Sequence, residues 1–190
     1  ISLEQNKDYP NMEFVIVDYN SKDDLQQYIL GPEIKPYVES GRVKLISTKT
    51  PQFYSMSKSR NLGFKNSSGE IVLNSDADNY LGLNFADYIN KMACLQRQKA
   101  VFCKSKRLFH GKIGFYRSEW ENLLQGYDEK IENYGGEDQD LLYRAMALGF
   151  KLMWWGGQEN FNERIKTPRN LITQNFQEKS WKTSEHLNKQ

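Results

Sequence analysis

The stretch "EIVLNSDADNYLG", residues 70–82, decides how this chain is interpreted. An apolar run from Ile71 to Leu73 stops, and two carboxylates, Asp76 and Asp78, follow with one residue between them. A continuous apolar run is typical of a strand that is covered on both faces. Aspartate is also a common turn residue. The stretch therefore predicts a buried strand, followed either by a solvated turn or by a cation site.

Strand-like and helix-like segments alternate along the whole chain. The predicted strands cover residues 13–18, 42–48, 70–76, 100–104, 111–117 and 151–155. The predicted helices cover residues 22–30, with Ser21 as N-cap, and 52–69, 83–98, 118–124 and 137–149. This alternation predicts an α/β fold with a largely parallel sheet flanked by helices. Ligands of such sheets bind at the carboxyl ends of strands, where Asp18, Asp76 and Asp78 all fall.

The composition limits the classes of function. The 190 residues fit one domain, and 26 basic against 24 acidic side chains argue against a nucleic-acid binder. No apolar run approaches the roughly 18 to 20 residues of a membrane span, and the first residues do not resemble a signal peptide. Cys94 and Cys103 make no disulfide framework, so reduced thiols are expected. Two histidines, His110 and His186, are too few for a histidine-rich metal site.

The pair Asp76 and Asp78 fits a metal site and a solvated turn equally well if the preceding strand is buried. Two adjacent carboxylates repel each other unless a cation neutralises them. Oxygen ligands of this kind suit Mg²⁺ or Mn²⁺, which also bind the oxygens of a diphosphate and assist its departure. A strand followed by Asp-x-Asp also occurs in metal-dependent phosphatases. Those enzymes usually carry Thr or Val where this chain has Tyr80.

A second acidic group lies in "YGGEDQDLLYRAMALGF", residues 134–150. Glu137, Asp138 and Asp140 fall in the first turn of a predicted helix, where negative charge is favoured. For Asp140 this explanation suffices. The glycine pair before Glu137 and Asp138 lets the backbone approach a ligand closely, and a carboxylate there can take the proton of an attacking hydroxyl.

Taken in order, three stretches resemble a family 2-type glycosyltransferase of the GT-A fold: "FVIVDYNS" (14–21), "SKSRNLGFKNSSGEIVLNSDADN" (57–79) and "GKIGFYRSEWENLLQGYDEKIENYGGEDQDLLYRAMALGFK" (111–151). The likeness is greatest to galactosyl- and N-acetylgalactosaminyltransferases with a Gly-Gly-Glu-Asp motif. It covers about residues 10–155. It implies a mixed, mostly parallel sheet, with a GT-A domain over 1–155 and a polar tail over 156–190 that completes or covers the site.

The resemblance also implies roles for individual residues. The residues expected at the nucleotide are Asp18, Asn20, Ser21, Arg60 and Asp76. Asp76 and Asp78 are the expected ligands of a divalent metal, Mn²⁺ or Mg²⁺, that bridges the diphosphate. Asp138 is the expected general base. The residues expected around the sugar and acceptor are Tyr134, Gly136 and Glu137.

The implied activity is inverting transfer of galactose, N-acetylgalactosamine or glucose from a UDP-sugar to a carbohydrate hydroxyl. The expected partners are the UDP-sugar, an oligosaccharide or glycoconjugate acceptor and a membrane surface contacted peripherally, with no nucleic acid. The expected location is the bacterial cytoplasm. The alternatives are a catalytically silent module that binds a sugar or nucleotide and, as a weaker one, the phosphatase.

The chain departs from the family in two ways. Such enzymes begin with a strand, a nucleotide-contacting loop and a helix, and "ISLEQNKDYP" resembles the end of that helix, so roughly 20 to 30 residues are expected to be missing. The absent strand would leave its neighbours in the sheet unpaired. Relatives also commonly supply a histidine as a third metal ligand, but residues 153–170 contain none and His186 is the only histidine downstream. Trp154 and Trp155 fit a sugar-stacking platform or the core equally well.

Overall fold

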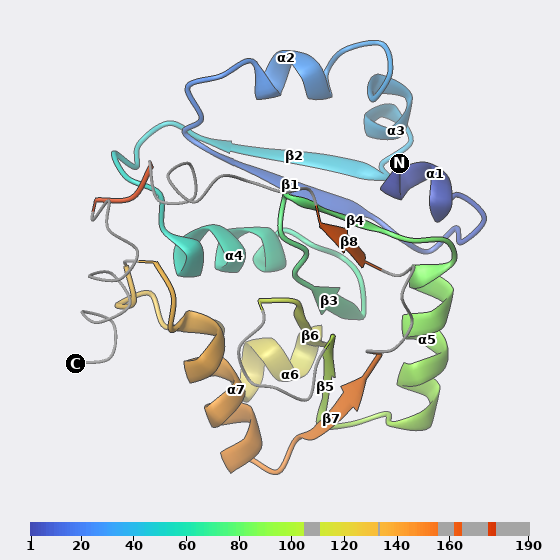
Figure 1. Cartoon of the computed structure of the whole chain (residues 1–190), viewed down its shortest axis with the longest axis vertical. Coiled ribbons are helices and arrows are strands. Elements are labelled where there is room, and N and C mark those ends of the chain that lie inside the picture. The colour runs from blue at the N-terminus through green and yellow to red at the C-terminus, as the bar shows by residue number, and fades with distance from the viewer. Residues whose placement is uncertain (105–110, 133, 156–161, 165–174, 178–190) are drawn as a thin grey trace.

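The structure, a computed structural model, describes residues 1–104, 111–132, 134–155, 162–164 and 175–177. Its helices are α1 (Ser2–Gln5), α2 (Leu25–Ile29), α3 (Lys35–Glu39), α4 (Met56–Lys65), α5 (Phe85–Leu95), α6 (Arg117–Asn122) and α7 (Glu137–Ala147). Its strands are β1 (Phe14–Tyr19), β2 (Val43–Thr48), β3 (Ile71–Leu73), β4 (Asn79–Leu81), β5 (Ala100–Cys103), β6 (Ile113–Tyr116), β7 (Lys151–Trp154) and β8 (Asn162–Arg164). Figure 1 shows the alternation of helices and strands that the sequence predicts.

The strands form a mixed arrangement. Strands β1 and β2 pair in parallel, as do β5 and β7. Strand β6 lies antiparallel to both β3 and β5, and β4 pairs antiparallel with β8. The mixed α/β class is therefore confirmed, with less parallel pairing than the alternation alone indicated. The link from β5 to β6 is too short for the crossover that a parallel pair needs, so β6 returns in the opposite direction.

A break separates β1 from β3. Among the described strands, β1 pairs only with β2, and β3 pairs only with β6. Across the break, Glu13 Oε1 accepts hydrogen bonds from Ser68 Oγ at 3.0 Å and from the backbone N–H of Gly69 at 3.3 Å. Within the described residues, no strand pairing therefore joins the β1–β2 pair to the β3–β6–β5–β7 ladder.

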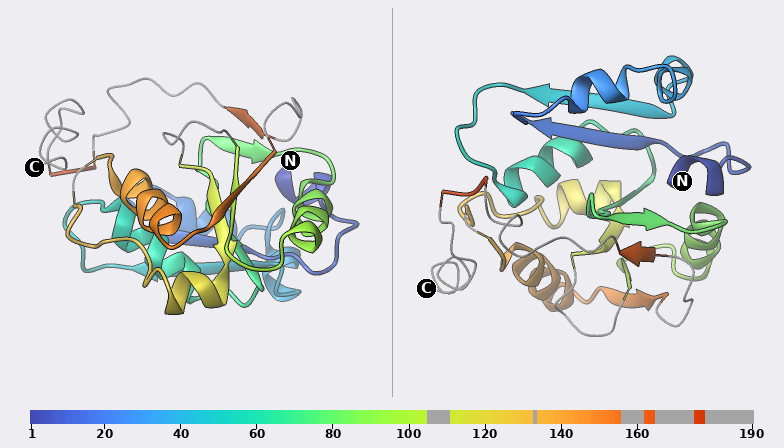
Figure 2. Two further views of the ribbon diagram at one scale, coloured as in Figure 1. Left: turned by 90° about the horizontal axis from the view of Figure 1, so that it is seen from below. Right: turned by 45° about the horizontal axis from the view of Figure 1, so that its top comes forward.

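The core covers both faces of the β3–β6–β5–β7 ladder. Side chains of β5 alternate, so Val101 and Cys103 pack on one face and Ala100 and Phe102 on the other. Helices α6 and α7 cover the first face and α5 covers the second, as Figure 2 shows. Cys94 is exposed on α5 and Cys103 is buried in β5, and no disulfide joins them, as expected.

Two predicted helices are shorter in the structure. The helix expected over 22–30 begins at Leu25, and Ser21 does not cap it, because the backbone N–H of Ser21 donates to the Asp18 carboxylate. The helix expected over 52–69 begins after Ser55, whose hydroxyl accepts from the backbone N–H of Lys58. The residues before it are held differently, since Tyr54 N donates to the carbonyl of Asn175 at 2.8 Å. Helix α3 was not predicted.

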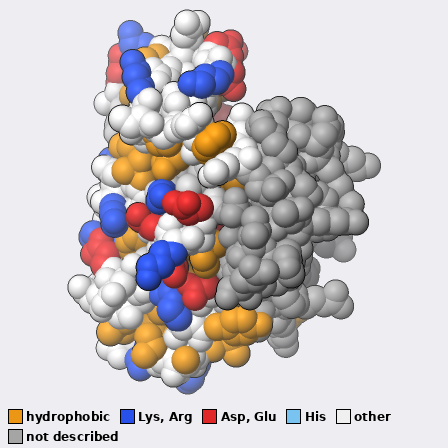
Figure 3. Space-filling model, turned by 90° about the vertical axis from the view of Figure 1, so that its left-hand side faces the viewer, with side chains coloured by type: hydrophobic (Ala, Val, Ile, Leu, Met, Phe, Trp, Pro, Cys, Tyr) orange, Lys and Arg blue, Asp and Glu red, His pale blue; other side chains and the backbone are white. Residues whose placement is uncertain are grey.

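The described surface carries both signs of charge. On the face seen in Figure 3, Lys and Arg side chains alternate with Asp and Glu over the part that the structure describes. Among the described residues, no helix has the length and apolar character needed to cross a membrane.

One buried asparagine fastens α1 to the rest of the fold. Asn6 is 1% exposed, and its Nδ2 donates to the carbonyls of Ser2 at 3.0 Å and Gly82 at 3.1 Å. Its Oδ1 accepts from the backbone N–H of Ala86 at 2.9 Å. The Asn6 amide thus joins the end of α1 to Gly82 and to the first turn of α5, beside the hydrogen bonds from Leu81 N to Ser2 Oγ and from Asn84 N to the carbonyl of Gln5.

We expect Asn6→Ala to lower the free energy of unfolding by about 1 to 3 kcal/mol, because buried backbone groups lose their partners. Urea unfolding followed by circular dichroism measures the change. Asn122→Ala is the matched control, since Asn122 makes one exposed hydrogen bond within its own helix. Equal effects of the two substitutions would contradict the role given to Asn6.

Candidate active site

A buried arginine on α4 gathers three carboxylates. Arg60 Nη1 lies 2.6 Å from Glu137 Oε1 and 2.5 Å from Asp138 Oδ1, and Nη2 lies 3.6 Å from Asp76 Oδ1. The side chains of Arg60, Glu137 and Asp138 are 6%, 2% and 15% exposed, and that of Asp76 is 35% exposed. We call these four residues the Arg60 cluster. It brings the acidic turn after β3 together with the first turn of α7.

The polar face of α4 places Arg60 at this point. Ser57 Oγ donates to the carbonyl of Ile131 at 3.0 Å. Asn61 Nδ2 donates to the carbonyl of Tyr127 at 2.9 Å, and its Oδ1 accepts from Tyr127 N at 2.8 Å. Ser57, Arg60 and Asn61 are all buried. These bonds hold the segment before α7 against α4, so that α7 begins beside Arg60.

The glycine pair sets the start of α7. Gly135 and Gly136 have φ angles of 84° and 97°, a region that favours glycine. Gly136 is the N-cap, and the next two residues carry the carboxylates of the cluster. Asp140 does not join them: its Oδ2 accepts from Arg144 Nε at 2.9 Å, one turn along the same helix. This agrees with the interpretation of Asp140 as a helix-start charge.

Asparagine side chains hold the acidic turn after β3. Asn74 Nδ2 donates to the carbonyl of Gly111 at 2.5 Å. Asn79 N donates to the Asp76 carbonyl at 3.0 Å, and Asn79 Nδ2 donates to Asp78 Oδ1 at 2.5 Å. The stretch after β3 is therefore a turn, and it presents Asp76 to the buried guanidinium of the Arg60 cluster. The metal–diphosphate interpretation of Asp76 and Asp78 stays a prediction.

The backbone of Gly111 closes over the cluster. A Cβ atom at this position would lie 2.8 Å from Asp138 Oδ2, 2.9 Å from Arg60 Nη2 and 3.4 Å from Asp76 Oδ1. Any side chain here would displace the ends of the ion-paired groups. The absence of a side chain at residue 111 therefore allows the three groups to meet.

Burial raises the pKa of Asp138 to about 7. The guanidinium of Arg60 acts in the opposite direction, while the carboxylates of Glu137 and Asp76 raise the pKa further. Burial also acts to lower the pKa of Arg60, but Asp138 and Glu137 outweigh it and the net shift is upward. Three carboxylates around one guanidinium leave an excess of negative charge, which favours a proton or a further cation at the cluster.

The raised pKa predicts that stability falls as the pH rises. The ordinary value for an aspartic acid is 3.8, and in the folded chain Asp138 has a pKa of about 7. Between these values the folded chain binds more protons than the unfolded chain, so each pH unit lowers the free energy of unfolding by roughly 1 kcal/mol. We therefore expect the difference in free energy of unfolding between Asp138→Asn and the wild type to change in favour of the variant from pH 4 to 7, as measured by urea unfolding without metal. A constant difference would contradict this assignment.

One oxygen of the cluster has no partner. Glu137 is 2% exposed, and its Oε2 finds no hydrogen-bond donor in the described part of the chain. A buried oxygen without a donor costs free energy unless a ligand supplies one. The structure thus leaves Glu137 Oε2 buried beside Asp138 with an unmet capacity to accept a hydrogen bond.

Three of the residues expected at the nucleotide, Asp18, Asn20 and Ser21, lie at the carboxyl end of β1 or directly after it. Asp18 Oδ1 accepts from Ser21 N at 2.9 Å, and Oδ2 accepts from Gln26 Nε2 at 2.6 Å. Burial opposes ionisation of Asp18, but these hydrogen bonds outweigh it and lower its pKa. Asn20 has a φ of 60° and donates from Nδ2 to the carbonyl of Pro51 at 2.7 Å. Asp18 thus orders its own loop.

A cavity of about 200 Å³ opens beside this loop. Its lining includes Tyr19, Phe53 and Tyr54, together with Gln52 and Gln177. Flat aromatic and amide groups of this kind suit a planar or ring-shaped ligand. Apart from its position next to the predicted strand end, nothing in the sequence pattern marked this cavity.

Tyr134, expected at the sugar, contacts a residue that sequence reasoning missed. Its ring centroid lies 5.7 Å from that of Phe176, and Phe176 lies 5.2 Å from Tyr54. Phe176 is 2% exposed although its neighbours in sequence are polar. An isolated aromatic residue in a polar segment was the available signal. Residues 175–177 therefore pack at the site, while most of the tail, including His186, lies outside the described residues.

A metal site would rest on few protein ligands. Within the described ranges, no group of three or more His, Cys, Asp or Glu side chains is arranged to hold a metal ion. Asp76 and Asp78 supply the oxygen ligands that Mg²⁺ and Mn²⁺ prefer. Such a pair suits a metal that takes its remaining ligands from a diphosphate and water.

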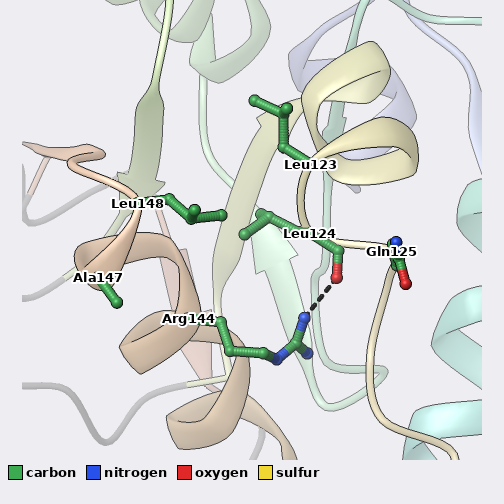
Figure 4. A pocket seen from close by; sticks show the side chains of 6 residues that line it. All are labelled: Leu123, Leu124, Gln125, Arg144, Ala147 and Leu148. Carbon is green, nitrogen blue, oxygen red and sulfur yellow. Dashed lines mark hydrogen bonds between the residues drawn. The ribbon is translucent and has the colours of Figure 1, made fainter.

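The larger cavity lies elsewhere. An open pocket of about 380 Å³ lies between the end of α6 and the end of α7, lined by Leu123, Leu124, Gln125, Arg144, Ala147 and Leu148. Figure 4 shows Arg144 donating to the carbonyl of Leu124 across it. Its lining carries no acidic side chain, so it offers no group for acid–base or metal chemistry.

Trp154 and Trp155 were each expected either in a sugar-stacking platform or in the core, and the structure separates them. Trp155 is 2% exposed and packs against Phe85 with ring centroids 5.4 Å apart, so it belongs to the core. Trp154 is 43% exposed. The platform interpretation is therefore wrong for Trp155, because neighbouring residues of a strand face opposite sides.

Comparison with known proteins gives a family match. The profile described as "Glycosyl transferase family 2" matches residues 2–139. No curated protein matches the chain.

Solved structures of low sequence identity share the fold. TarS 1–349 of S. aureus in complex with UDP-GlcNAc is similar with a TM-score of 0.70 and 17% identity, covering 88% of this chain and 53% of that chain. The mannosyltransferase PcManGT of Pyrobaculum calidifontis with GDP-Man and Mn²⁺ gives 0.63 and 18%, covering 82% and 49%. Drosophila β1,4-galactosyltransferase 7 with manganese, UDP-Gal and xylobiose gives 0.56 and 11%, covering 94% and 80%. The chain spans about half the length of the TarS 1–349 structures it matches.

Proposed function

The chain belongs to glycosyl transferase family 2 and has the GT-A fold, and on this premise we propose that it transfers a sugar from a UDP-sugar to a carbohydrate hydroxyl with inversion. The observation that carries the proposal is the Arg60 cluster. It sets a buried carboxylate, Asp138, beside the acidic turn that carries Asp76. A base for the acceptor and an acidic turn for a metal–diphosphate are the two groups that such a transfer requires.

In the proposed reaction, the acceptor oxygen forms a bond to the anomeric carbon while the bond from that carbon to the diphosphate breaks. UDP leaves with the bonding electron pair, and Asp138 takes the proton of the acceptor hydroxyl. Attack from the face opposite the leaving group gives inversion. A pKa of about 7 for Asp138 suits a general base that works near neutral pH.

On the donor side, Asp76 and Asp78 would hold Mn²⁺ or Mg²⁺. A divalent metal bound there would neutralise the charge of the departing diphosphate. Asp18, Asn20 and Ser21 would lie near the nucleotide, and the cavity beside them offers aromatic rings to the base. The TarS and Drosophila structures hold UDP donors, which supports uridine as the base.

On the acceptor side, Glu137 would receive a hydrogen bond from a sugar hydroxyl. Its Oε2 is buried without a partner among the described residues, and it adjoins the proposed base. Tyr134 and Gly136 would line the same space. The donor sugar is a separate question. Galactose, N-acetylgalactosamine, glucose and N-acetylglucosamine all present hydroxyls that could make such a contact, so experiment must identify the donor.

Titration of UDP into the protein by calorimetry, with and without Mn²⁺, tests the proposal. We expect UDP to bind with Mn²⁺ at least tenfold more tightly than without it, and more tightly than GDP. Release of UDP from the four UDP-sugars then reports turnover with water as acceptor. A folded protein that binds no UDP would reject the proposal. Metal-dependent UDP binding without release or transfer would favour the catalytically silent module.

A further inference from the structure

The guanidinium of Arg60 is enclosed by its own protein. The Tyr127 ring covers one face, with its centroid 5.4 Å from Arg60 Cζ. Both terminal nitrogens face carboxylates: Nη1 contacts Glu137 and Asp138, and Nη2 lies 3.6 Å from Asp76 Oδ1. The side chain is 6% exposed. A phosphate could reach this group only by displacing contacts that the described fold already makes.

The contacts of Arg60 tie together two separate parts of the site. Asp138 belongs to α7, and Asp76 belongs to the turn between β3 and β4. A guanidinium is a planar fork with fixed donor directions, so it sets the positions of its partners relative to each other. A lysine in its place would offer one point charge and could not keep both partners in the same arrangement.

From this geometry we infer that Arg60 is a positioning residue, which holds the Asp138 carboxylate in place and fixes it relative to Asp76, and is not a ligand of the nucleotide. The inference rests on the proposed function, in which Asp138 takes the acceptor proton. It replaces the expectation, drawn from the resemblance, that Arg60 lies at the nucleotide.

Gly111 provides a second way to disturb the same arrangement. A Cβ here would lie 2.8 Å from Asp138 Oδ2 and 2.9 Å from Arg60 Nη2, so these groups would have to move. The substitution removes no charged group. Gly111 is not among the glycines with positive φ, so alanine meets no backbone strain there. Gly111→Ala therefore shifts the base without removing the arginine.

The experiment compares Arg60→Lys and Arg60→Met with Arg144→Lys and Arg144→Met. Arg144 is the matched control, because it pairs with Asp140 of the same helix at 2.8 Å, outside the cluster. UDP affinity is measured by calorimetry with Mn²⁺. Turnover is measured as UDP release from the best of the four UDP-sugars, with KM and kcat separated. Thermal unfolding reports whether each variant is folded.

We expect both Arg60 variants to keep the UDP affinity within about threefold and to lower kcat by about 10²-fold or more, since a misplaced catalytic group costs rates of this order. The Arg144 variants should change neither value more than about threefold. Gly111→Ala should lower kcat and keep the UDP affinity. If the Arg60 variants do not fold, this variant alone tests whether the arrangement of Arg60 and Asp138 is needed for turnover. A tenfold loss of UDP affinity in Arg60→Lys, or an unchanged kcat, would overturn the inference.

A failure of the proposed function is recognised separately. If the wild type neither binds UDP nor releases it, the role of Asp138 in transfer is lost, and the contact is tested by unfolding alone. Asp138→Asn changes the unfolding equilibrium constant by one factor in the wild type and by another in the Arg60→Lys background. We then expect these two factors to differ at least tenfold. Equal effects in both backgrounds would show that Arg60 does not hold Asp138.

Discussion

Asp138→Asn is expected to lower sugar transfer by about 10² to 10⁴-fold, the usual contribution of a positioned general base. Asparagine keeps the size of the side chain, so the contact with the guanidinium region and the fold should persist. It cannot take the proton of the acceptor hydroxyl. The affinity for UDP should change less than about threefold, because the nucleotide is expected near Asp18 and the acidic turn, and not at α7.

Steady-state transfer or donor hydrolysis, together with UDP calorimetry, measures both quantities. Asp140→Asn is the control, since Asp140 lies in the same turn of α7 but pairs with Arg144 outside the cluster. Its turnover should stay within about twofold of the wild type, as expected for a group outside the site. Parallel loss of UDP binding and turnover in Asp138→Asn would mean that Asp138 is not the base. Unchanged turnover would mean the same.

The second large effect is expected at the acidic turn. Asp78→Ala should remove the dependence of UDP binding on Mn²⁺, with a loss of affinity on the order of 10- to 100-fold. The Asp78 carboxylate would supply an oxygen ligand for the metal, and the metal would neutralise charge on the diphosphate. In the absence of metal, the variant and the wild type should bind UDP with similar affinity.

Calorimetry of both proteins with and without Mn²⁺ gives the four affinities needed. Asp128→Ala is the control, because Asp128 Oδ1 only accepts a hydrogen bond from Lys130 N in an exposed loop. That substitution should leave the Mn²⁺ effect intact. If Asp78→Ala binds UDP as the wild type does at every metal concentration, Asp78 is not a metal ligand.

Local sequence patterns were sufficient for most of the helices and strands and for the acidic motifs. The run Ile71 to Leu73 forms β3, and the carboxylates after it form a turn. The glycine pair before α7 adopts the positive φ that only glycine readily takes. Errors fell where tertiary contacts override propensity, as before α4, where Tyr54 bonds to Asn175 from the far end of the chain.

Neither acidic motif alone predicts that the turn with Asp76 and the helix start with Glu137 and Asp138 lie close together. Arg60 bonds to Glu137 and Asp138 across 77 and 78 residues of sequence, and no periodicity of a few residues reports such a separation. The expectation that Arg60 lies at the nucleotide came from the resemblance to the family alone. Only the packing of α4 against the segment before α7 showed that its partners are protein carboxylates.

The sequence by itself determined most of the elements that form and which residues carry charge at their ends, because propensity, capping and apolar spacing act within a few residues. Tertiary structure alone decided which of those charges are buried together, that Phe176 returns to Tyr134, and that one asparagine secures α1. The physical reason is that burial and ion pairing depend on which distant segments share a core. The pKa of Asp138, about 7, is set in the same way by neighbours from three separate elements.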